Sequence, residues 1–247
     1  MKQYLKKLAD RNAYTTFRSS SDYITPNVSL LTTENEMHYN PYIDPYNGHS
    51  YVEIGGLKWA TMNVGANSVT DIGLYFQWGD TQGYTANQAG DGEGQKYFGV
   101  DDYIYYNDEY FTKYNETDGK ITLDLTDDAV NAAWGSQWRM PTVSEFIALY
   151  EAVTTVWTDD YHGSGVAGMM CTDKTDSSKV LFFPACSHVR DTHAVEIDSC
   201  CYWSSSLNAD YGDGDAYFLC LNDGNSDYIF YDQRYTGYPV RGIFVEN

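Results

Sequence analysis

Short apolar segments separated by glycine- and aspartate-rich turns are the feature that most constrains the fold of this chain. Runs at 51–54, 57–64 and 73–79 predict short strands, and Gly55-Gly56 predicts the turn between the first two. Aspartate outnumbers glutamate 25 to 10, and aspartate favours turns and caps whereas glutamate favours helices. The sequence therefore predicts a strand-rich chain with few helices.

Two helices are expected. Residues 127–134 have an acidic first turn and stop at Gly135. The stronger helix begins at Thr142, because Thr142 and Glu145 have the spacing of a capping box and apolar residues between 146 and 153 recur at helical spacing.

More strands are expected in the second half of the chain. They cover residues 168–171, 180–184, 201–206, 216–221 and 238–245. Residues 80–120 have weak periodicity and predict long irregular loops, which are uncommon in compact domains unless function requires them. This pattern predicts an α+β domain closed by its own last strand.

The first 45 residues differ from the rest. Residues 1–12 are a candidate for a short helix. Residues 15–40 are rich in Ser, Thr and Asn with few aliphatic side chains, so residues 1–45 are expected to form an extended N-terminal arm that orders only against a partner surface. Two prolines and an Asn-Gly turn between 39 and 48 mark a boundary. We therefore expect one domain over 46–247 and docking of the arm onto a neighbour, for instance in a homo-oligomer such as a trimer.

Charge and hydropathy exclude several classes of protein. The formal net charge is −20, so the surface repels phosphate backbones and neither nucleic-acid binding nor attraction to anionic membranes is expected. No run approaches the ~18 apolar residues of a membrane span. The basic start is not followed by an apolar stretch, so we expect no secretory signal peptide. The protein then stays in the cytoplasm or leaves by another route, such as inside a virus particle.

Cysteine and acidic residues are the candidates for metal or redox sites. The cysteines are Cys171, Cys186, Cys200, Cys201 and Cys220. Their number is odd and their spacing matches no zinc signature, so free, mostly buried thiols are expected, with one disulfide open in an oxidising setting. The adjacent Cys200 and Cys201 would bridge poorly. Residues 210–215 resemble a calcium loop only superficially. No cofactor is expected, although structural calcium there and a metal site within residues 80–128 stay open.

Six short sequence segments, which follow one another in a fixed order along the chain, resemble one family. They are residues 56–66, 75–81, 134–142 with Glu145-Phe146, 182–185, 202–206 and 239–241. Together they are similar to the "major paralogous domain" family of Fibrobacter and Bacteroidetes proteins, which resembles the C-type lectin fold in the branch near formylglycine-generating enzymes. The resemblance covers about residues 50–245. It implies an α+β C-type lectin fold with few helices, short antiparallel strands and long irregular loops.

The resemblance also implies diversification of the C-terminal region, about residues 200–241. Domains of this kind are frequent targets of diversity-generating retroelements, whose copying errors at adenines scatter asparagine codons mainly to Asp, Tyr, Ser, Gly and similar residues. Residues 204–238 fit, because they contain no Lys, Glu, Met or Trp and are rich in Asp, Tyr, Asn, Ser and Gly. Tyrosine gives a large rigid contact face at low entropic cost, as in antibody paratopes.

We therefore expect the last forty or so residues to lie outside the hydrophobic interior as a recognition surface. The predicted ligand-binding residues are Asn208, Asp210, Tyr211, Asp213, Asp215, Asn225, Ser226, Asp227, Tyr228, Phe230, Tyr231, Asp232, Arg234, Tyr235 and Tyr238. The alternative is a set of solvated turns with some tyrosines in the core. Tyr202, Tyr217, Phe218 and Leu221 are expected in the core because they fall in predicted strands.

The remaining aromatic and arginine residues are expected to be structural. These are Trp59, Trp78, Trp134, Trp138, Arg139, Trp203 and Arg241. Arg139 is expected to form an ion pair with Asp128 or Glu145. The five histidines show no metalloprotease spacing, and no catalytic residue is predicted.

Three functions follow as hypotheses. The first is a receptor-binding protein of a phage tail, located on the virion, that recognises a host cell-surface protein or glycan. The N-terminal arm is also similar to lead-in segments of structural proteins from gut Bacteroidetes phages. The second is a bacterial cell-surface or pilus-tip adhesin with the same fold. The third is an enzyme of the formylglycine-generating type, although the sequence shows no matching catalytic motif and the expectation is a protein that is not an enzyme.

Overall fold

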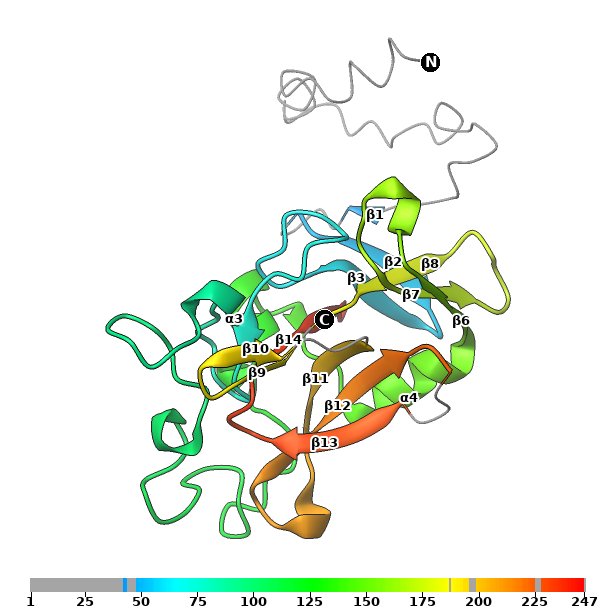
Figure 1. Ribbon diagram of the computed structural model, residues 1–247. Coiled ribbons are helices and arrows are strands. Elements are labelled where there is room, and N and C mark those ends of the chain that lie inside the picture. The colour runs from blue at the N-terminus through cyan, green and yellow to red at the C-terminus, as the bar shows by residue number, and fades with distance from the viewer. Residues whose placement is uncertain (1–41, 44–47, 187, 196–198, 225–227, 247) are drawn as a thin grey trace, which may run out of the picture. The chain divides into compact units, whose positions relative to one another are not determined.

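The computed structural model describes residues 42–43, 48–186, 188–195, 199–224 and 228–246. These residues form a mostly-sheet α+β fold with few helices and short antiparallel strands (Figure 1). The predicted arm, residues 1–45, lies outside the described residues except for Tyr42 and Ile43, so its docking role stays a prediction. Within the described part, no helix is long and apolar enough to cross a lipid bilayer.

A five-stranded sheet joins the start and the end of the described chain. Its strands, in spatial order, are β1 (Tyr42–Ile43), β2 (Ser50–Ile54), β3 (Leu57–Asn63), β15 (Arg241–Phe244) and β5 (Trp138–Arg139). The last strand, β15, lies between β3 and β5 and is antiparallel to both. The expectation of a domain closed by its own last strand is therefore confirmed.

The strand expected over residues 238–245 is two strands in two sheets. β14 (Tyr238–Pro239) pairs with β4 (Tyr75–Phe76), whereas β15 pairs with β3 after Val240. Val240 accepts a hydrogen bond from the backbone N–H of Val64 at this point. An apolar run carries no signal of the point where a strand leaves one sheet for another, so the sequence alone predicted one strand.

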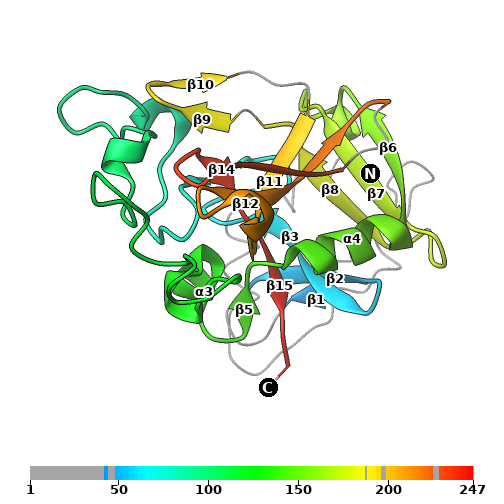
Figure 2. The ribbon, with the colours of Figure 1, turned by 90° about the horizontal axis from the view of Figure 1, so that it is seen from below.

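The predicted helices are present, and each is capped. In α3 (Ala129–Trp134), the Asp128 carboxylate accepts the N–H groups of Val130 and Asn131. In α4 (Val143–Ala152), Thr142 and Glu145 form the predicted capping box. Helix α4 contacts β11 and β12 and leads directly into β6 (Figure 2).

Two further three-stranded sheets follow α4. One contains β6 (Val153–Thr158), β7 (Gly168–Asp173) and β8 (Val180–Pro184), so the strands expected over 168–171 and 180–184 are confirmed and pair as an antiparallel hairpin. The other contains β11 (Ser199–Leu207), β12 (Asp215–Asn222) and β13 (Ile229–Gln233). A short ladder of β9 (His188–Arg190) and β10 (His193–Val195) lies between them in sequence.

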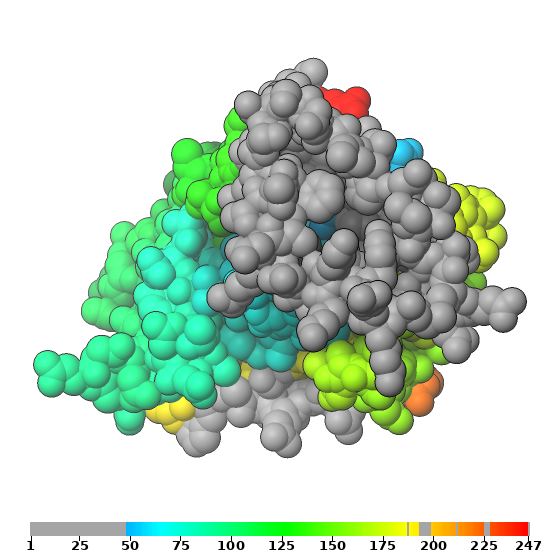
Figure 3. Space-filling view, turned by 90° about the horizontal axis from the view of Figure 1, so that it is seen from above, coloured from blue at the N-terminus to red at the C-terminus, as the bar shows by residue number. Residues whose placement is uncertain are grey.

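Long irregular segments connect β4 to α3, as expected for residues 80–120. They contain the 3₁₀ turns Ala86–Gln88, Val100–Asp102 and Leu125–Asp127 and several isolated bridges. Further 3₁₀ turns lie at Tyr161–Gly163 and Ala209–Tyr211. In the space-filling view the cyan and green loop residues form a large part of the visible described surface (Figure 3).

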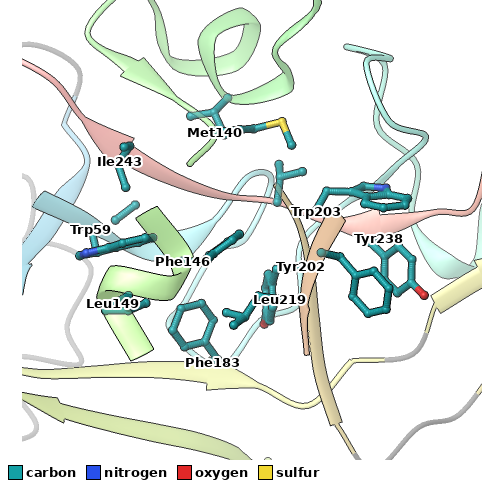
Figure 4. Packing of buried hydrophobic residues seen from close by; sticks show 14 of the residues in the cluster. Trp59, Met140, Phe146, Leu149, Phe183, Tyr202, Trp203, Leu219, Tyr238 and Ile243 are labelled. Atoms are coloured by element: carbon teal, nitrogen blue, oxygen red, sulfur yellow. The ribbon is translucent and has the colours of Figure 1, made fainter. Parts of the chain in front are cut away.

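One aromatic-rich core joins the three larger sheets (Figure 4). Trp59, Trp78, Trp138 and Trp203 are fully buried, and Trp134 is 9% exposed. Burial of rings of this size is a dominant stabilising contribution in a core, because each removes a large apolar area from water. These five tryptophans, which the sequence predicts to be structural, therefore all lie in the core.

Two arginines link elements of this scaffold. Arg241 is fully buried and donates to the carbonyls of Ala60 and Phe182, which lie in different sheets. Arg139 forms a bidentate pair with Glu145 at 2.6 and 2.8 Å. Of the two expected partners of Arg139, Asp128 and Glu145, it is Glu145 that forms the direct ion pair. Burial alone would raise the pKa of Glu145, but the Arg139 guanidinium holds that pKa below its ordinary value.

Candidate functional site: the exposed face of β12 and β13

The candidate site is one face of the β12–β13 hairpin together with the loop before it. Cross-strand register pairs Tyr217 with Tyr231 and Asp215 with Gln233, so these four side chains share a face. Tyr231 is 48% exposed, Gln233 is exposed, and Tyr217 and Asp215 are half-buried. We call the following residues the display surface: Asp210, Asp213, Asp215, Tyr217, Tyr231 and Gln233.

The opposite face of the same hairpin is packed against the core. Phe218 is paired in register with Trp203 on β11 and with Phe230 on β13. Its ring stacks on Tyr238 at a centroid distance of 4.8 Å. Successive side chains along a strand point to opposite faces. One hairpin therefore exposes polar residues on one face and buries aromatic rings on the other.

Three predicted ligand-binding residues are buried, and their assignment is corrected. Asn208 is 1% exposed, Arg234 is 0% exposed and Tyr238 is 3% exposed, so none of them can contact a macromolecular ligand in this structure. Asn208 accepts the Asp210 N–H and begins the 3₁₀ turn at Ala209–Tyr211. The expectation that the last forty residues lie outside the interior is therefore wrong for about half of the segment.

Four more predicted residues are half-buried and already make contacts within the protein. The Tyr228 ring stacks on Tyr150 at a centroid distance of 3.7 Å. Phe230 packs against the core. Asp232 forms an ion pair with Arg190 and accepts the Tyr238 hydroxyl at 3.0 Å. Tyr235 donates its hydroxyl to Gln233, which belongs to the display surface.

Some predictions fall outside what can be described. Asn225, Ser226 and Asp227 are not among the described residues, and nothing is described of the Tyr211 side chain. Their roles stay predictions. Tyr217, in contrast, was expected in the core with Tyr202, Phe218 and Leu221, and it lies half-buried on the display surface, whereas the other three are buried.

Buried Arg234 joins the loop between β11 and β12, residues 208–214, to the long loop that precedes α3. We call residues 208–214 the display loop. Its guanidinium donates to the carbonyls of Asp213, Lys113 and Tyr114 at 2.9–3.2 Å and to the Tyr103 hydroxyl at 2.9 Å. Four aromatic rings surround it; they belong to Trp78, Tyr103, Phe111 and Tyr114. Burial raises the pKa of the Tyr103 phenol, which keeps this partner neutral. Arg234 therefore fixes the position of two loops instead of meeting a ligand.

The long loop adds exposed apolar side chains beside the display loop. Four large hydrophobic residues of this segment are about half exposed or more: Ile104, Tyr110, Ile121 and Leu125. The Leu207 N–H donates to the Ile121 carbonyl at 2.9 Å, and Leu123 N–H donates to Ser205. Figure 1 shows the β11–β12 loop and these green loops at the same end of the described unit. Sequence reasoning did not assign them, although the unusual loop length was a signal.

The electrostatics of the display surface are acidic. Burial raises the pKa of Asp215, and the nearby Asp232 carboxylate adds to this effect. The two arginines of this region, Arg190 and Arg234, are engaged with Asp232 and with backbone carbonyls respectively. Among the described residues, no group of three or more His, Cys, Asp or Glu side chains is placed to hold a metal ion.

No protein-family model matches this chain, and searches of curated proteins and of solved structures return no significant match.

Proposed function

We propose that this protein is a non-enzymatic receptor-binding protein with a C-type lectin fold, and that the display surface contacts a protein or glycan on a host cell. Its place is the tail of a phage, and the region around β11–β13 is the part diversified by a retroelement. The family resemblance of residues 50–245 and the pairing of β15 with β3 support the lectin fold.

The separation of exposed and buried residues within one hairpin carries the proposal. Tyr217 and Tyr231 face outward, while Phe218 and Phe230, the next register pair, face inward. Outward positions on a rigid strand pair can change without removing a core side chain. Exposed substitutions of this kind usually shift stability by ~0.5 kcal/mol or less. This arrangement suits a surface that must vary while its scaffold persists.

The composition of the surface indicates the chemistry of the partner. Tyr217 and Tyr231 offer aromatic faces. The Asp210 carboxylate lies 3.5 Å from the Tyr217 hydroxyl, and Asp215 shares the face of both tyrosines. With a net charge of −20, such a surface attracts a basic epitope and repels an acidic one. Ile121 is 60% exposed and its carbonyl accepts the Leu207 N–H at the end of β11, so it adds apolar area that an epitope can cover.

Whole-cell binding tests the proposal directly. Fluorescently labelled full-length protein would be incubated with a panel of gut Bacteroidetes strains and measured by flow cytometry. We expect saturable binding to a subset of strains. The variant Tyr217→Ala/Tyr231→Ala/Gln233→Ala should lose at least about tenfold in affinity, the loss of one or two contact hot spots.

A matched control changes exposed residues elsewhere. Thr154 and Val156 are exposed on β6, and Val156 is 51% exposed. The variant Thr154→Ala/Val156→Ala should bind like the wild type. Equal binding by the display variant, or no binding to any strain, contradicts the proposal.

The diversification mechanism has an independent test in the flanking DNA. Sequencing around the gene should find a near-repeat of the region encoding about residues 200–241 that differs at adenines, beside a reverse transcriptase gene. Absence of both removes the retroelement while leaving the binding surface testable on cells. A secretion or lipoprotein signal upstream would move the protein to the bacterial surface as an adhesin.

A further inference from the structure

Five cysteines are described, and two of them face each other across the strands that support the display surface. Cys201 on β11 and Cys220 on β12 are directly opposed in register. Their sulfur atoms are 2.7 Å apart. Opposed residues of an antiparallel pair have Cα atoms about 4.5–5.5 Å apart, within the span of about 4.4–6.8 Å that a disulfide bridges.

The other three thiols are fixed differently. Cys200 points to the opposite face of β11, and its thiol lies 3.1 Å from the Phe183 carbonyl. Cys186 contacts the Cys201 backbone N–H and carbonyl, each at 3.1 Å. Cys171 is buried, and burial raises the pKa of its thiol to about 12. The vicinal pair Cys200-Cys201 is thus directed apart, which leaves Cys220 as the partner of Cys201.

Access and acidity distinguish the two opposed thiols. Cys201 is 2% exposed, whereas Cys220 is only partly buried and lines a pocket with Tyr150, Met169 and Tyr228. The hydrogen bond from Cys201 lowers the pKa of Cys220, and the same interaction raises the pKa of Cys201. Since the thiolate is the nucleophile in exchange, Cys220 is the thiol that reacts first.

We propose that Cys201 and Cys220 form a reversible cross-strand disulfide by exchange with a small-molecule disulfide such as oxidised glutathione. The Cys220 thiolate attacks one glutathione sulfur, forms a mixed disulfide and releases one glutathione thiolate, which is protonated. Cys201 then loses its proton and attacks the Cys220 sulfur, which releases the second glutathione. Two protein thiols are oxidised, and one glutathione disulfide is reduced to two thiols.

The bond would act on the display surface through the frame, by which we mean the buried core and the strands and helices that support that surface. It closes the chain between residues 201 and 220, which includes the loop around Asp210 and Asp213. A cross-link of a loop of roughly twenty residues restricts the unfolded chain, so the oxidised protein resists unfolding more than the reduced one. Cys201 and Cys220 lie on the strand face that carries Trp203 and Phe218, opposite Tyr217, so the link uses no side chain of the display surface.

Mass spectrometry of single-cysteine variants tests the proposal. Reduced full-length protein would be incubated with excess oxidised glutathione, quenched with N-ethylmaleimide and weighed intact. The wild type should lose two hydrogen masses and retain three alkylatable thiols. Cys201→Ala should instead gain one glutathione on Cys220, because the resolving thiol is gone. Cys220→Ala should gain nothing and form no bond.

Control variants identify which two cysteines form the bond and whether the bond stabilises the protein. Cys200→Ala and Cys171→Ala should still form the bond, and peptide mapping of Cys200→Ala should link the peptides of Cys201 and Cys220. Oxidation should raise the wild-type Tm by about 5–10 °C, reversed by dithiothreitol, and should leave the Tm of Cys220→Ala unchanged. A wild type that stays fully reduced or collects glutathione, or a bond that requires Cys200, overturns the proposal.

Discussion

Two tyrosines of the same C-terminal segment lie in opposite environments. Tyr231, on β13, is 48% exposed, whereas Tyr238, on β14, is 3% exposed. The Tyr238 ring stacks on Phe218 and meets Trp203 edge-on, each at 4.8 Å between centroids, and its hydroxyl donates to Asp232. Tyr231 shares its face with Tyr217 and Gln233, at the edge of the sheet.

Amino-acid composition therefore does not distinguish the exposed positions of this segment from the buried ones. Both tyrosines belong to a stretch rich in Asp, Tyr, Asn, Ser and Gly, yet only Tyr238 is buried in the core. Strand alternation assigns Tyr231 to the outward face, and the turn at Arg234 directs the chain into the core before Tyr238. A variable surface can thus be interleaved with fixed residues at intervals of one or two positions.

Substitution of a fully buried tryptophan should destabilise the protein most. Trp203→Ala should lower the free energy of unfolding by about 3–5 kcal/mol, because it removes a fully buried ring. Its indole N–H also donates to the carbonyls of Phe76 and Thr236. Urea denaturation followed by circular dichroism measures this loss. A loss below about 1 kcal/mol would mean that β11 is not part of the frame.

The next effect concerns the boundary between the two regions. Arg234→Lys should lower stability by about 2–4 kcal/mol, since an ammonium group cannot reproduce the planar set of bonds to three carbonyls and the Tyr103 hydroxyl. The display loop should also become more accessible, with faster cleavage near Asp213 in limited proteolysis. Arg190→Lys is the matched control, because Arg190 is half-exposed. Equal effects of the two variants would show that burial does not set Arg234 apart.

The comparison extends to carboxylates. Burial raises the pKa of Asp128, in the frame, from 3.8 to about 6. The folded-state pKa is above the unfolded value, so the protonated carboxyl contributes stability that is fully present below about pH 4. That contribution is lost as the pH rises through about 6, because the buried group must then ionise. The stability difference between wild type and Asp128→Asn should therefore fall by up to about 3 kcal/mol between about pH 4 and 7.

Measurement of urea midpoints across that range tests the sign. Asp215→Asn, on the display surface, should show a smaller change in the same direction, because burial also raises the pKa of Asp215 but water screens this half-buried group. A flat or rising difference for Asp128→Asn contradicts the assignment of Asp128 as a buried frame carboxylate.

Local signals predicted much of the frame from sequence. The capping box at Thr142, the alternating strand at Ser50–Ile54 and the continuous apolar strand at Val180–Pro184 depend on neighbours within a few residues, and they appear as expected. The burial of Arg234 and Tyr238 depends instead on contacts with residues far away in sequence, such as Tyr103 and Trp203. Composition could locate the segment that contains the display surface but could not divide it, because that division is tertiary.

Substitution of the exposed Tyr231 should change stability least. Tyr231→Ala should change the free energy of unfolding by about 0.5 kcal/mol or less, because the ring is half exposed. Tyr238→Ala removes the same side chain from the core and should cost about 3–5 kcal/mol. Thermal and urea unfolding of the two variants gives the ratio directly. If both substitutions cost the same, the outward face of β13 is part of the frame, and a surface that tolerates variation must be sought in the loops before α3.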